Sequence, residues 1–115
     1  MNPAAAFELY RQKVFAQPEL TPADGGLFAA MRSEDKKANL RLIMGISRWV
    51  IERIEAIPQA DKVAANLDPL ELLTQANAVV GERMRAYKGE SVEEFRGLLM
   101  PALDARLHAL FGRKI

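Results

Sequence analysis

The chain has 115 residues, and its 16 Lys and Arg stand against 15 Asp and Glu for a net charge of +1. This length predicts a single helical domain over residues 1–115, large enough to bury a core of its own. The balanced charge argues against the basic face typical of nucleic-acid-binding proteins, and the absence of cysteine excludes disulfides and thiolate metal sites.

Capping residues and prolines divide the first half of the chain into three predicted helices. The first begins at Asn2-Pro3 and ends near Gln17, because the proline that follows disfavours a helical residue before it. Residues 21–24 (Thr-Pro-Ala-Asp) begin a short second helix with the pattern of a capping box. Ser33 is predicted to cap a long central helix near 34–57.

The second half carries equally clear signals for two more helices. After a long connection, in which one helical turn around 63–66 is compatible with the sequence, Asp68-Pro69 begins a helix that Gly89 is suited to end. Ser91 begins the last helix with a capping box. Pro101 lies inside that helix, which is therefore predicted to be kinked or split. No segment alternates with period two, so the predicted fold is all-α, a small bundle of about five helices.

The central helix is more apolar than a helix that covers one side of a core. Such a helix needs an apolar stripe of roughly 100°, and here the stripe spans about twice that. The apolar residues are Leu40, Leu42, Ile43, Met44, Ile46, Trp49, Val50, Ile51, Ile54 and Ile57. We therefore predict packing from two sides, by this chain, by a second copy or by another protein. Gly45 within the helix marks either a close approach of a neighbour or a tolerated glycine.

One shoulder of this apolar arc is the candidate contact surface for a protein partner. It consists of Leu42, Ile46, Trp49 and Arg53. Trp and Arg are the residue types most enriched at binding hot spots. The centre of the arc, made of Ile43, Val50 and Ile54, is predicted to face the core. The opposite shoulder holds Leu40, Met44 and Ile51. The alternative to a partner-binding surface is that this helix is the central helix of the bundle. Other helices of the same chain would then cover both of its shoulders.

Residues able to catalyse a reaction are few. His108 is the only histidine, and Asp104 lies one turn before it, but two ligands do not make a metal site. Ser47 could pair with His108 as a nucleophile, yet no oxyanion-hole motif accompanies it. We therefore expect a protein that is not an enzyme and that needs no metal or other cofactor.

No membrane partner is predicted either. The first residues lack the basic region and long apolar run of a signal peptide, and Glu8 interrupts them early. The longest strongly apolar run, 42–46, is far shorter than the roughly 18 residues needed to span a bilayer. We expect a cytoplasmic protein.

These features favour a protein-binding module that acts stoichiometrically through an apolar helix surface, as a homodimer. Many small bacterial and phage accessory proteins share this general type, among them regulators, adaptors, inhibitors, chaperones and assembly factors, which is an analogy of class only. No motif identifies the partner.

The alternative function is that of a small helical nucleic-acid-binding regulator. Lys36, Lys37 and Arg41 cluster at the start of the central helix and would contact phosphates. A second basic group, near the end of the following helix, consists of Arg83, Arg85 and Lys88. Ordinary cations on exposed helix faces and at helix C-termini explain most of these positions equally well.

Overall fold

The structure is a computed structural model that describes residues 3–64, 66 and 68–112, and within them it is helical with no strand. The elements are α1 (Pro3–Phe15), the 3-10 turn η1 (Pro22–Gly25), α2 (Gly26–Arg32), α3 (Lys36–Glu55), α4 (Gln59–Ala64), α5 (Pro69–Ala86) and α6 (Val92–Gly112). The all-α prediction is confirmed. The short helix α4 begins earlier than the predicted turn at 63–66, of which residue 65 lies outside the described residues.

Local signals predicted the first two helical segments closely. α1 ends at Phe15, two residues before the predicted end at Gln17. The second segment begins as the turn η1, where the Asp24 carboxylate accepts a hydrogen bond of 2.7 Å from the Thr21 backbone N–H. This is the bond expected from the acidic member of a capping box. The predicted cap at Asn2 lies outside the described residues.

The corner between α2 and α3 differs from the prediction. Ser33 does not cap α3 but ends α2, because its backbone N–H donates back to carbonyl oxygens of that helix. The cap of α3 is Asp35, whose carboxylate accepts hydrogen bonds of 3.0 and 3.1 Å from two backbone N–H groups of the first turn. Between them, Glu34 adopts a φ of 64°. This reversal closes α2 in a Schellman motif, so α3 begins later than predicted.

The two C-terminal helices follow the predicted starts more closely than the predicted ends. The Asp68 carboxylate caps α5 with a hydrogen bond of 2.9 Å from a first-turn N–H. α5 ends where Tyr87 turns to an extended conformation, and no described glycine has a positive φ, so Gly89 is not its C-cap. α6 continues through Pro101 without being split. Both Pro101 and Gly97, whose carbonyl loses its helical partner, are exposed, so water can hydrate that carbonyl.

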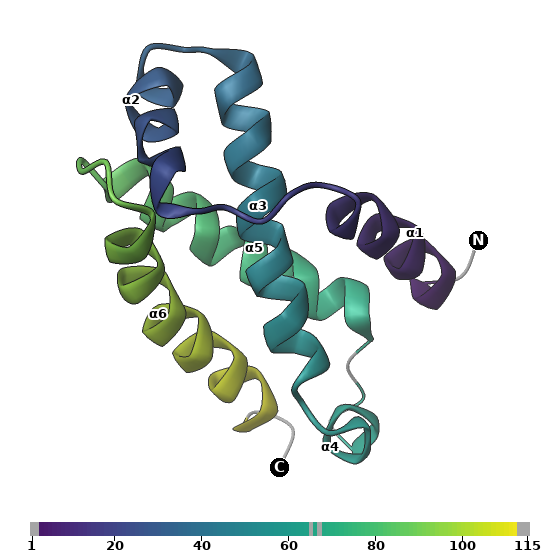
Figure 1. The fold of residues 1–115 in the computed structure, drawn as a ribbon. Helices are drawn as coiled ribbons and strands as arrows, with labels where there is room; N and C mark the ends of the chain where they lie inside the picture. The colour runs from purple at the N-terminus through teal and green to yellow at the C-terminus, as the bar shows by residue number, and fades with distance from the viewer. Residues whose placement is uncertain (1–2, 65, 67, 113–115) are drawn as a thin grey trace.

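α3 is the central helix of the fold and packs against α1, α2 and α5 (Figure 1). Its buried residues extend around most of its circumference, and they are Ala38, Leu42, Gly45, Ile46, Ser47, Trp49, Val50, Ile51 and Ile54. Only the first half of α3 retains large exposed apolar side chains, Leu40 and Ile43. The wide apolar arc therefore belongs to a central helix covered mainly by its own chain, which is the alternative that the sequence left open.

The connection from α1 to η1 crosses α3 (Figure 1). Two arginines of α3 hold it there. Leu20 lies against Gly45, and a Cβ atom on that glycine would be only 2.3 Å from the Leu20 Cγ atom. Arg41 donates a hydrogen bond of 3.2 Å to the Glu19 carbonyl oxygen, and Arg48 lies 3.2 Å from the Glu19 carboxylate. The close approach at Gly45 is thus made by a connection of the same chain.

Candidate functional site

Three of the four residues predicted to contact a partner lie in the core of the protein. Leu42 and Ile46 are fully buried, and Trp49 is only 5% exposed. Arg53 is half-buried and forms an ion pair with the Asp104 carboxylate of α6. The prediction of this shoulder as an accessible contact surface is therefore wrong, because neighbouring helices of the same chain cover it.

The basic residues of the nucleic-acid alternative do not share one face. Lys36 and Lys37 are exposed; Lys36 lines one hollow, whereas Lys37 and Arg41 line another. Arg41 is half-buried, and besides its bond to the connection that crosses α3 it lies 3.9 Å from the Asp24 carboxylate. The charge of Arg41 is used within the fold, which leaves two of the three cations for a phosphate.

The catalytic pair considered from the sequence is not assembled. Ser47 is buried on α3, where its hydroxyl oxygen accepts a hydrogen bond of 2.7 Å from the Tyr10 hydroxyl. His108 is exposed on α6, and Asp104, one turn before it, pairs instead with Arg53. In the part of the chain that the structure describes, no three His, Asp or Glu side chains are grouped as metal ligands would be.

The first half of α3 presents a different surface, centred on Ile43. This side chain is 38% exposed and lies in a groove of about 330 Å³ between the end of α2, α3 and the last turns of α5. We call this surface the Ile43 groove, and its lining residues are Met31, Arg32, Asn39, Ile43, Gly81, Met84, Arg85, Tyr87 and Lys88. The expectation that Ile43 faces the core is wrong, because the helices that cover the second half of α3 leave this side of its first half open.

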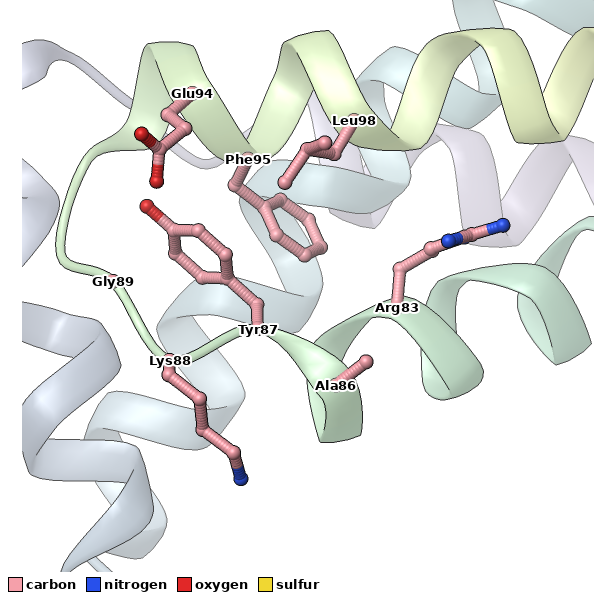
Figure 2. Close-up of a pocket in the computed structure, with 8 residues that line it drawn as sticks. All are labelled: Arg83, Ala86, Tyr87, Lys88, Gly89, Glu94, Phe95 and Leu98. Atoms are coloured by element: carbon pink, nitrogen blue, oxygen red, sulfur yellow. The ribbon is translucent and has the colours of Figure 1, made fainter.

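A second pocket, of about 320 Å³, lies between α5 and α6 and shares Tyr87 and Lys88 with the groove (Figure 2). Figure 2 shows the Tyr87 hydroxyl directed at the Glu94 carboxylate, with Phe95 and Leu98 of α6 nearby. Lys88 extends away from Glu94 in the same view. The segment after α5 therefore borders both hollows.

Aromatic packing anchors this segment to α2 and α6. Phe28 of α2, Tyr87 and Phe95 of α6 are buried, with ring centroids 5.0, 5.2 and 5.3 Å apart. Such aromatic contacts add about 0.5–1.5 kcal/mol beyond the area they bury. The Tyr87 hydroxyl also donates to the Ser91 carbonyl oxygen at 3.1 Å and accepts from the Ser91 N–H at 2.9 Å. One wall of the groove is thus held rigidly.

The hydroxyl of Tyr87 has a perturbed acidity. Burial raises the pKa of Tyr87 above its ordinary value of 10.0, and the Glu94 carboxylate raises it further. The hydrogen bond with Ser91 and the positive charge of Arg32 oppose this effect. The folded state therefore favours the protonated form of Tyr87.

We expect the free energy of unfolding to fall as the pH rises above about 10. In that range the unfolded chain has lost the Tyr87 proton while the folded protein still holds it. The stabilisation is therefore complete below the unfolded pKa and is lost as the pH rises through the folded pKa. Urea unfolding from about pH 9 to pH 11, followed by circular dichroism, measures the slope. Tyr87→Phe should remove the contribution of Tyr87 to this slope. If the variant has the same slope as the unchanged protein, the pH dependence comes from other groups.

Two features of the Ile43 groove could be recognised in the sequence, but the sequence did not show that they lie side by side. Arg85 and Lys88 were recognised as a basic group, and Ile43 as part of an apolar arc. What brings them together is the packing of residues 81–88 against residues 31–43. The spacing of side chains within each helix carries no information about which helices become neighbours.

Comparisons with known proteins find no family model, no curated protein and no solved structure that matches this chain. Among the residues described, no helix combines the length and apolar character needed to cross a membrane. The function is therefore argued from the surface of the protein.

Proposed function

We propose that this protein is a non-enzymatic binding module that acts stoichiometrically by holding a segment of a partner protein in the Ile43 groove. The observation that supports this is an apolar side chain exposed in a concave surface, beside Met31 and Met84. Methionine adapts its shape to varied apolar partners. Apolar surface rimmed by polar residues is typical of protein-binding sites.

This is the kind of function that the sequence favours, but it is assigned to a different surface of the protein, the Ile43 groove. A regulator, inhibitor, chaperone or assembly factor can act through such a groove by binding alone. A cytoplasmic location belongs to the same proposal, since a chain without cysteine suits a reducing compartment.

Homodimerisation remains a prediction of the sequence, but the surface proposed for it is buried in the core. A two-fold contact through the Ile43 groove would place Arg32, Arg85 and Lys88 against the same residues of a second copy. Like charges that face one another disfavour association. Multi-angle light scattering at two protein concentrations and two salt concentrations tests for a dimer directly.

We expect Ile43→Asp to remove partner binding and to leave the fold intact, because the new carboxylate would remain hydrated at a groove that needs an apolar contact. The loss at a central contact should be at least about tenfold. The measurement is affinity capture from the native cells on the immobilised full chain, with quantitative mass spectrometry. Circular dichroism checks that the variant is folded.

The matched control is Leu9→Asp, which makes the same change at another exposed apolar residue. Leu9 is 45% exposed on α1 and does not line the groove. A partner captured by the unchanged protein and by Leu9→Asp, but not by Ile43→Asp, supports the proposal. Equal capture by all three proteins contradicts it.

A further inference from the structure

We infer that the Ile43 groove takes an acidic amphipathic helix of the partner protein, an inference that rests on the binding function proposed above. The charge of the groove is the first reason. Of the described residues that line it, three are cationic, Arg32, Arg85 and Lys88, and none is acidic. A groove with charges of one sign attracts and orients a segment of the opposite sign.

Within the described part of the chain, the fold gives these three cations no ion-pair partner. Among the described residues, ion pairs form at Arg11, Arg41, Arg48 and Arg53. None forms at Arg32, Arg85 or Lys88 within that same part of the chain, although Arg32 donates a hydrogen bond of 3.0 Å to a backbone carbonyl oxygen. The groove therefore concentrates cations that a carboxylate from outside can neutralise.

Two acidic residues at the start of α3, Glu34 and Asp35, lie close to the groove in sequence but are not among its lining residues. They line an adjoining hollow that shares Met31 and Asn39 with the groove. The Asp35 carboxylate is already used, because it accepts hydrogen bonds from the first turn of α3. Among the described residues, no carboxylate forms an ion pair with Arg32, Arg85 or Lys88.

The walls of the groove favour a helix as the occupant. Both long walls are helices, and the described residues offer no strand edge to which an extended peptide could add. An amphipathic helix laid between helices contacts them through apolar residues spaced by three and four positions. Leu40, which is 61% exposed and lies one turn before Ile43 on the same apolar strip of α3, adds apolar surface beside the groove, in the hollow that Lys37 also lines. Such a helix would place its apolar face on this strip and its carboxylates toward Arg85 and Lys88.

A nucleic acid fits this surface less well. Proteins that bind single strands stack bases on exposed aromatic rings. Among the described residues that line the groove, Tyr87 is the one aromatic, and its side chain is buried between Phe28 and Phe95. The apolar floor of methionine and isoleucine side chains suits aliphatic groups of a peptide.

Selection from a library of short random peptides displayed on phage, with the full chain as bait, tests the inference. Peptides that bind the unchanged protein and Leu9→Asp, but not Ile43→Asp, are those that occupy the groove. We expect them to carry net negative charge and apolar residues at helical spacing. Their binding should weaken as salt is added, because salt screens exposed charges.

A charge reversal in the groove provides the second measurement. With one selected peptide labelled by fluorescein, anisotropy titration should show about tenfold weaker binding to Lys88→Glu. Lys13→Glu makes the same change on an exposed part of α1, away from the groove, and should bind like the unchanged protein. Lys88 suits this test because it is exposed and forms no ion pair among the described residues.

The possible results separate this inference from the proposed function. Groove-dependent peptides with neutral or basic character, or equal binding to Lys88→Glu and Lys13→Glu, would overturn the acidic helix while leaving protein binding in place. No groove-dependent peptides at all would overturn both. Binding of a labelled single-stranded oligonucleotide that Lys88→Glu weakens, without any selected peptide, would also overturn both and would favour a nucleic-acid ligand.

Discussion

Replacing Ile46 with aspartate should unfold the protein. The Ile46 side chain is completely buried in the main hydrophobic cluster, so the substitution removes apolar contacts and places a carboxylate among hydrocarbon. A buried, unpaired charge belongs to the few changes that cost more than about 4 kcal/mol. The whole stability of a domain is about 5–15 kcal/mol. We therefore expect most of the helical circular dichroism to be lost, or a urea midpoint shifted far toward zero.

The control for this prediction lies three residues earlier on the same helix. Ile43→Asp makes the identical chemical change at a side chain that is 38% exposed, and it should shift the urea midpoint only slightly. The two isoleucines cannot be distinguished by hydropathy or helix propensity. If Ile46→Asp folded normally and instead lost a dimer, the burial of this shoulder within one chain would be refuted.

Gly25→Ala should destabilise the protein by about 3 kcal/mol, the upper end of the cost of overpacking. A Cβ atom at this position would lie 2.0 Å from the Glu90 carbonyl oxygen, and a backbone atom cannot turn away as a side chain can. The φ of Gly25 is −55°, which alanine adopts without strain, so the cost is steric. Relief would require the start of α2 to move from the α5–α6 connection. For a chain of this size the melting temperature should fall on the order of 10 °C.

An alanine at the neighbouring glycine, Gly26, should change the stability in the opposite direction. A Cβ atom on Gly26 has nothing within 4 Å, and the residue is helical and exposed. Gly26→Ala should therefore stabilise the protein by about 0.5 kcal/mol through helix propensity. Differential scanning calorimetry of both variants makes the comparison. Equal and small effects would show that α2 and the connection at Glu90 are not in close contact.

Which side chains form the candidate site could not be predicted from the sequence. The apolar arc of α3 was recognised, and it was correctly expected to pack on more than one side. The arc gave no reason to assign Ile46 to the core and Ile43 to the surface. That division depends on where α1, α2 and α5 pack against α3, which the sequence of α3 does not show. Hot-spot statistics drew attention to Trp49, but a large aromatic residue serves a core equally well.

Where the start of a helix depends only on neighbouring residues in the chain, the sequence alone determined it. Asp68 and Pro69 begin α5 as predicted, because the carboxylate reaches backbone N–H groups within the next turn. The same capping chemistry gave a wrong prediction at Ser33, because the cap of α3 is Asp35, two residues later. Both residues can cap a helix, and the choice depended on how α2 ends through the reversal at Glu34.

Only the tertiary structure decided which apolar and charged residues meet. The helical content, the order of the helices and the apolar face of each follow from interactions that reach three or four positions along the chain. The Ile43 groove joins residues near positions 31, 43 and 84, which are distant in the sequence. Their contact results from burying all the helices in one core together, and no single segment carries that information.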